Sequence, residues 1–376
     1  MRKSRLSSLF AVFLGVALTA VAPASADMKA FNAAVKAGDY RSAAVAAKTA
    51  WTSWDKSDPD TAVVAREFGF AAYMSGDYAT AREYGLFLQD HGASLPKPDD
   101  QPVISRVLLS AANYRLGASG QTRQALFDAL KIRAAGSGID MQSIVASEAL
   151  YRGDWASRNW MGAAQSGEMA YALIERAGSG MLPRAMQGKT VSVIAGFLGG
   201  RDKQDYENIV EAHNAVVDAI DKAPEPKRRQ DLIPLKFQLE AWASSVHAFF
   251  ESSQQTGSLI PKNVKELPLK ETGRSLFEER QVGADACQGE LDTTGLRYPH
   301  MAEFTGMVGT VILKFDTNAQ GSVSNTEVLA AVPVAQFAKT VEAAASRFRL
   351  KPRSGDPVGC SLVAQSRVIT FSFVIL

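Results

Sequence analysis

The 376-residue sequence contains few of the side chains that most often form catalytic or metal sites. It has two cysteines and four histidines, and the histidines do not have the spacing of a metal-binding pair. A Gly-x-Ser-x-Gly segment and a complete phosphate-binding loop are also missing, since Gly188-Lys189-Thr190 matches only the end of such a loop. The acidic residues do not follow the spacing of a calcium loop. These absences predict a protein that is not an enzyme and that uses no metal or other cofactor.

The charge of the chain does not favour a nucleic-acid partner. The sequence contains 41 Lys and Arg and 39 Asp and Glu, a formal net charge of +2. Without Arg2, Lys3 and Arg5, which lie in a segment expected to be removed, 38 basic and 39 acidic residues remain, a net charge of −1. Basic residues do not form a stripe interleaved with aromatic residues. We therefore expect no nucleic-acid partner.

The first 26 residues have the pattern of a secretory signal peptide. A basic start precedes the almost wholly apolar run Leu6–Ala22, and Pro23-Ala24-Ser25-Ala26 supplies the small residues of a cleavage site. We expect cleavage after Ala26 and no membrane insertion of the mature chain, because no later stretch reaches 18 uncharged apolar residues. The alternative is an uncleaved membrane anchor, since a run of about 17 apolar residues is at the lower limit for spanning a bilayer.

Residues 27–251 are expected to form an α-helical domain with a repeated signature. Gly38-Asp39-Tyr40 and Gly76-Asp77-Tyr78 each precede an alanine five residues after the glycine. Gly120-Gln121-Thr122 keeps this step to Ala125, and Gly153-Asp154-Trp155 starts the pattern again without the alanine. The glycines are 38, 44 and 33 residues apart, which is typical of stacked helical hairpins.

The signature resembles the tetratricopeptide repeat. Glycine and aspartate permit a tight turn between two helices, and a small alanine lets the helices approach closely. The clearest unit covers residues 59–91, and further helices are expected at Gln204–Lys222 and Leu232–Glu251. The resemblance implies a repeat solenoid that presents an extended surface to partner proteins. Generic helical hairpins are the alternative.

The composition changes after Glu251. Residues 252–285 are polar and interrupted by proline and glycine, and we interpret them as a linker. Residues 286–376 then alternate apolar and polar positions in two runs joined by a turn at residues 318–321, followed by an apolar-striped helix at Val334–Phe348. A last alternating strand covers Arg367–Leu376. This order predicts a small α+β domain, with one helix packed on a three-stranded antiparallel sheet.

The C-terminal pattern resembles the C-terminal domain of TonB-family energy transducers. Tyr298-Pro299, the glycines Gly306 and Gly309, the hairpin, the helix ending at Phe348-Arg349-Leu350 and the final strand follow the order of that family. The resemblance implies a Gram-negative periplasmic protein that catalyses nothing and binds an envelope protein, in that family a peptide of an outer-membrane receptor, by strand addition. The partner-binding residues that it carries over are Tyr298, Pro299, Arg367, Val368, Thr370, Phe371 and Phe373. Alternatively, Tyr298-Pro299 fixes where the chain joins the sheet, and Phe371 and Phe373 belong to the core.

The two cysteines, Cys287 and Cys360, lie in or beside this C-terminal domain. An even number of cysteines in an exported protein favours a disulfide over two free thiols. The resemblance to the TonB domain places both residues at the same end of the sheet.

Two functions are consistent with these patterns. The first is an exported adaptor that carries a TonB-like binding domain on a helical scaffold. The second is a TonB-family energy transducer of outer-membrane transport that keeps its N-terminal helix as an anchor. The chain lacks the proline-rich spacer of a transducer, which favours the adaptor.

Overall fold

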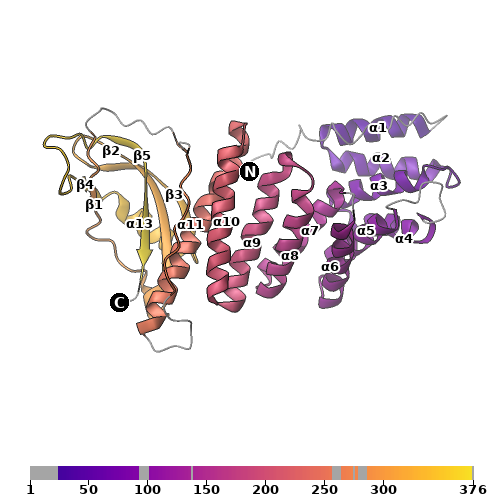
Figure 1. Ribbon diagram of the computed structural model, residues 1–376. Helices are drawn as coiled ribbons and strands as arrows, with labels where there is room; N and C mark the ends of the chain where they lie inside the picture. Colours follow the sequence, from indigo (N-terminus) through magenta and orange to yellow (C-terminus); the bar gives the residue numbers. More distant parts are fainter. Residues whose placement is uncertain are drawn as a thin grey trace. The chain divides into compact units, whose positions relative to one another are not determined.

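A computed structural model describes residues 24–92, 101–136, 139–255, 264–273, 276–277 and 286–374 (Figure 1). The chain divides into two compact units, Met1–Gly188 and Lys189–Leu376. Most of the expected signal peptide, residues 1–23, lies outside the described residues, and the first helix begins at Ala24. Among the described residues, no helix combines the length and the apolar composition that a membrane span requires.

The first unit is built from helices, and consecutive helices pack against each other. The helices are α1 (Ala24–Ala37), α2 (Tyr40–Ser53), α3 (Thr61–Ser75), α4 (Tyr78–His91), α5 (Gln101–Leu116), α6 (Gly120–Ala135), α7 (Met141–Ala156) and α8 (Trp160–Glu175). A short 3-10 helix (Ser179–Met181) leads to α9 (Leu182–Gly200), in which the boundary between the two units falls. This mostly helical region is consistent with repeat-like helices.

The predicted glycine–aspartate turns are confirmed at the first two positions. Gly76 has a φ of 90°, a backbone conformation that glycine adopts without strain. Asp77 then caps α4, because its carboxylate accepts a hydrogen bond from the Thr80 backbone N–H at 3.1 Å. Ala81 is fully buried and lets α4 approach its neighbour. The Gly38-Asp39 turn between α1 and α2 is built in the same way.

The prediction that Gly153-Asp154-Trp155 starts another turn is wrong. This segment lies inside α7, and the turn follows it, with Asn159 as the cap of α8. A side chain at Gly153 would overlap the hydroxyl of Tyr114, so close packing explains the glycine. The signature at Gly120 differs as well, because this residue begins α6 and Ala125 is exposed.

The second unit combines the second half of α9 and the helices α10 and α11 with the predicted α+β fold. After the second half of α9, its elements are α10 (Lys203–Lys222), α11 (Pro226–Gln255), β1 (Glu290–Asp292), α12 (His300–Phe304), β2 (Gly309–Thr317), β3 (Val323–Val332), α13 (Ala335–Ala345), β4 (Arg349–Lys351) and β5 (Ala364–Phe373). The predicted helices at 204–222 and 232–251 are therefore confirmed, and the second is longer than expected.

The predicted three-stranded antiparallel sheet is also confirmed. Its order is β3-β2-β5, and α13 packs on one face through Phe337 and Val341, which are fully buried. A separate two-stranded ribbon pairs β1 with β4, which the sequence pattern does not predict. The last strand is Ala364–Phe373 rather than Arg367–Leu376, and residues 375–376 lie outside the described part of the chain.

The opposite face of the sheet is covered by α11. This helix packs along β2, β3 and β5, so β2 is buried on both faces. Val311 and Leu313 point toward α13, and Ile312, which points the other way, is also fully buried. The apolar residue on the second face of β2 therefore contributes to a second layer of core.

Residues 264–273, which we call the strap, lie beside α10 and form neither a helix nor a strand. The Leu267 backbone N–H donates to the Tyr206 hydroxyl at 3.0 Å, and the Lys270 N–H donates to the Asn214 side-chain oxygen at 2.8 Å. The strap belongs to the segment 252–285, for which the sequence predicts a linker. Its described part is thus attached to a helix by hydrogen bonds.

Candidate functional site

The candidate site is an outer edge of the three-stranded sheet. Within the described strands, β3 and β5 each pair with β2 on one side only. The other side of such an edge strand carries backbone N–H and C=O groups that can pair with a further strand. The two edges differ in regularity, and this difference decides which of them suits a partner.

The pairing of β3 is interrupted twice. The register moves from Ile312–Ala330 to Leu313–Val328 and again between Lys314 and Asp316. The longest uninterrupted run on this strand is therefore Ala330–Val332. Both α11 and α13 also pack against β3. Bulges of this kind bend an edge strand and disfavour the addition of another strand.

The pairing of β5 is regular over most of its length. Residues Arg367–Phe373 pair without a shift with Phe315–Gly309, which makes a run of seven residue pairs. The only interruption lies before this run, where Gln365 and Ser366 stand opposite Asp316. The outer edge of β5 from Arg367 to Phe373, which we call the β5 edge, is thus the longest regular edge of the described sheet that has no second partner strand among the described strands.

One carboxylate supports the bulges on both outer strands. Asp316 Oδ1 accepts a hydrogen bond from the Ser366 backbone N–H at 2.8 Å, and Oδ2 accepts one from Asn325 Nδ2 at 2.7 Å. Ser366 and Asn325 have φ values of 56° and 48°, which are uncommon for residues other than glycine. The alternating pattern of β2 gives no signal for this role, so Asp316 could not be predicted as a site residue from the sequence.

Tyr298 and Pro299 lie in the fold rather than on an open surface. The Tyr298 ring packs against Phe337 and Phe373 with centroid distances of 6.1 and 5.6 Å. Its hydroxyl donates to the Met307 carbonyl at 2.6 Å, and burial raises the pKa of this hydroxyl. Pro299 is buried and directly precedes α12. Both residues hold the segment that leads into β2.

The candidate residues of β5 divide into two groups. Phe371 and Phe373 are buried in the core beneath α13. Val368 is 37% exposed and Thr370 is exposed. The Arg367 guanidinium donates to the carbonyls of Cys287 and Gln288 and so binds the chain's own backbone. Among these side chains, only Val368 and Thr370 are accessible to a partner. All five residues, however, contribute their backbone to the outer edge of β5.

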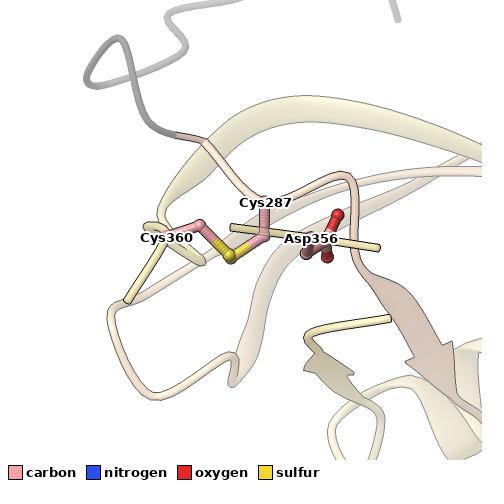
Figure 2. A group of neighbouring side chains, drawn as sticks. All are labelled: Cys287, Asp356 and Cys360. Atoms are coloured by element: carbon pink, nitrogen blue, oxygen red, sulfur yellow. A yellow bond between two sulfur atoms is a disulfide. The ribbon is translucent and has the colours of Figure 1, made fainter. Parts of the chain in front are cut away.

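The predicted disulfide is present between Cys287 and Cys360 (Figure 2). It joins the segment before β1 to the loop before β5, with 5.0 Å between the two Cα atoms. A backbone hydrogen bond from Cys287 N–H to the Ser361 carbonyl, at 2.8 Å, lies beside it. The disulfide therefore fixes the start of the domain next to the strand that carries the β5 edge.

Asp356 completes this corner of the domain and does not form a metal site with the cysteines. The three residues are the only group at metal-ligand distances among the described residues. The two sulfur atoms form the disulfide and are therefore not thiolate ligands. The Asp356 carboxylate accepts hydrogen bonds from the backbone N–H groups of Gln288, Gly289 and Arg353 at 2.9–3.1 Å. The bond from Arg353 is the main cause of the lowered pKa of Asp356. The carboxylate thus caps the backbone around the disulfide.

A regular strand edge of this kind is one of the places where interaction domains can take up an extended segment. Residues 294–373 match the family model of the Gram-negative bacterial TonB protein C-terminal. The match runs from just before Tyr298 to the end of β5, so it confirms the resemblance seen in the sequence. This region is a TonB-like domain of the kind that interacts with envelope proteins. Comparisons with curated proteins and with solved structures found no match.

Proposed function

We propose that this protein is an exported, non-catalytic adaptor of the Gram-negative cell envelope, which binds an extended segment of a partner protein along the β5 edge. The observation that carries the proposal is the uninterrupted pairing of Arg367–Phe373 with β2. A regular edge of this length offers a row of backbone hydrogen-bond groups, which supply affinity in strand addition. Exposed Val368 and Thr370 then contact the side chains of the added segment.

Three further features support this proposal. The bulges of β3 make the other edge of the sheet a poor template. The match to the TonB C-terminal family points to a partner in the envelope, such as a peptide of an outer-membrane receptor. The signal-like pattern of the first 26 residues supports export to the periplasm. In the adaptor, the helical repeat region serves as a second interaction surface.

The alternative is an energy transducer of outer-membrane transport that keeps its N-terminal helix as an anchor. The family match favours this function, because the same domain is found in TonB proteins. The mass of the protein purified from cells distinguishes the two. A chain that begins at Asp27 supports the adaptor, and a chain that retains Arg2 to Ala26 supports the transducer.

Two substitutions on the β5 edge test the proposed site. Val368→Lys and Thr370→Lys place charges on exposed positions of the edge, where lysine discourages strand pairing. Thr326→Lys is the matched control, because Thr326 is an exposed residue on the irregular strand β3. Full-length proteins are cross-linked in envelope preparations, and the captured proteins are identified by mass spectrometry. We expect the β5 variants to lose a partner that the control keeps, and identical partner sets for all variants would contradict the proposal.

A further inference from the structure

A cleft of about 140 Å³ lies at the C-terminal end of the β5 edge. It is open to solvent and is lined by residues of α10, α11, the strap and the end of the sheet. The residues that line it are Tyr206 of α10, Ala243, Ser244, His247, Ala248 and Glu251 of α11, Glu266, Leu267 and Leu269 of the strap, and Ser372 and Val374. The cleft therefore begins where the proposed docking edge ends.

The alternation of β5 shows which side chains of an added strand would meet this cleft. Ser372 and Val374 are two residues apart, so they share the face of the sheet on which Val368 and Thr370 lie. A partner strand beside β5 is about 4.8 Å away, and its alternate side chains lie on the same two faces. The side chain that stands opposite the Ser372–Val374 region on this face would enter the cleft.

The chemistry of the cleft is acidic. Glu251 and Glu266 contribute two carboxylates, and the described residues that line the cleft include no lysine or arginine. His247 Nδ1 lies 3.8 Å from Glu251 Oε2. The Tyr206 hydroxyl already accepts the Leu267 N–H and so has a structural role. A cationic side chain complements these carboxylates, and a negatively charged one is repelled.

We infer that the cleft is a specificity pocket for a lysine or arginine of the partner segment that adds to the β5 edge. The inference rests on the proposed function, because the pocket receives a side chain only if a strand lies along β5. The backbone edge accepts any extended sequence, whereas the pocket selects the register in which a basic residue stands opposite Ser372–Val374. The size of the cleft suits the end of one such side chain.

A peptide series tests this inference with the full-length protein. The probes are fluorescent ten-residue peptides of alternating Thr and Val, in which one Thr at a time is replaced by Lys, Gln or Glu. Binding is measured by fluorescence anisotropy, and hydrogen exchange of residues 364–373 reports whether the peptide lies on β5. We expect one position at which Lys binds about fivefold more tightly than Gln, the size of a partly exposed ion pair, and Glu binds more weakly than either.

The pocket is tested by the double variant Glu251→Gln/Glu266→Gln. We expect this variant to lose the preference for Lys while β5 remains protected by the bound peptide. The control is Glu303→Gln/Glu342→Gln, which removes two exposed carboxylates on α12 and α13 and keeps the preference. Thermal melting checks that both variants are folded.

The other outcomes separate the two proposals. If β5 is protected but Lys, Gln and Glu bind equally, or if the preference survives in the Glu251/Glu266 variant, the pocket is wrong and the docking edge stands. If none of the peptides protects β5, the docking edge itself is wrong, and the pocket loses its basis with it.

Discussion

The Asp154 carboxylate joins three helices of the first unit. It is 2% exposed and accepts hydrogen bonds from Arg123 on α6 at 2.6 and 3.0 Å, and from Ser166 on α8 at 2.9 Å. Asn159, in the turn before α8, also donates to it at 3.0 Å. A buried charge of this kind is stable only while its partners are in place.

We predict that Asp154→Ala lowers the free energy of unfolding by about 3 kcal/mol, because the largely buried guanidinium of Arg123 loses its counter-charge. The double variant Asp154→Ala/Arg123→Met removes both charges and should lose less than the single variant. Urea denaturation of both proteins checks this. A double variant that is less stable than Asp154→Ala would show that the pair is not the source of the effect.

His213 gives the second unit a pH dependence. Its side chain is 1% exposed on α10, its Nε2 has no hydrogen-bond partner among the residues that the structure describes, and burial is the main cause of its lowered pKa. The folded protein therefore disfavours the protonated form. The unfolded chain takes up this proton near pH 6.5.

We predict that the free energy of unfolding is fully maintained above pH 6.5 and falls as the pH is lowered from there toward the pKa of the folded state. Below pH 6.5 the unfolded chain binds a proton at His213 that the folded chain does not. Denaturant unfolding at a series of pH values between 5 and 8 measures this slope. His213→Gln is the control and should have a smaller slope, while an unchanged slope would assign it to other groups.

At the scale of structural elements, the disulfide restrains a long segment of the TonB-like domain. Cys287 and Cys360 are 73 residues apart, and closing a loop of this length stabilises the folded state by about 4 kcal/mol in the chain-entropy model. We predict that Cys287→Ser/Cys360→Ser lowers the free energy of unfolding by about this amount. Wild-type protein measured with a reducing agent should match the variant, and the variant itself should not respond to the reducing agent.

The bulges of β3 and β5 depend on Asp316. We predict that Asp316→Ala lowers the free energy of unfolding by about 1–3 kcal/mol, because the Ser366 N–H and the Asn325 amide lose their acceptor. Asp316→Asn keeps an oxygen that can accept the Ser366 N–H, so its loss should be smaller. Hydrogen exchange at Ser366 provides a local measurement, and equal exchange in all three proteins would contradict this role.

Elements with a strong local signal could be predicted from the sequence. The turn at Gly76-Asp77 follows from residues that favour it directly. In the C-terminal domain, the strands follow from alternating apolar residues and the helix from its apolar stripe. Gly153-Asp154 has the same local signal, but Tyr114 from another helix occupies the space beside Gly153. Packing between helices determines that this segment is helical and not a turn, and a local sequence pattern carries no information about that packing.

The candidate site could be predicted only in part for the same reason. The alternating pattern identifies the last strand. However, the residues on both faces of a strand recur with the same period of two. The pattern alone therefore does not show that Phe371 is buried and Thr370 exposed, because this depends on which face α13 covers. The bulges depend on the register between strands, which the alternation of one strand does not fix. The cleft combines α10, α11, the strap and β5, which are far apart in the sequence.

At the scale of the whole molecule, the helices α10 and α11 belong to the same compact unit as the TonB-like domain. The sequence predicts a domain boundary at residues 252–285, and we retain 286–376 as a proposed domain whose independence can be tested. Without α11, the face of the sheet that includes Ile312 would be exposed to water. A fragment of residues 189–376 keeps that cover.

We predict that the fragment 189–376 folds cooperatively and that the fragment 286–376 is less stable and more prone to aggregate, because it exposes apolar surface. Circular dichroism melting and size-exclusion chromatography compare the two. If both fragments melt at the same temperature and remain monomeric, the domain boundary at 252–285 is sufficient for folding.

The shared use of Asp316 has a consequence for how this sequence can change over evolution. Residues 325 and 366 lie on strands that do not pair with each other, yet both hold left-handed backbone conformations beside one carboxylate. A lineage that replaces Asp316 loses support on both sides of the sheet at once. We therefore expect positions 316, 325 and 366 to covary as a group of three, with glycine at the outer two wherever the acid is lost.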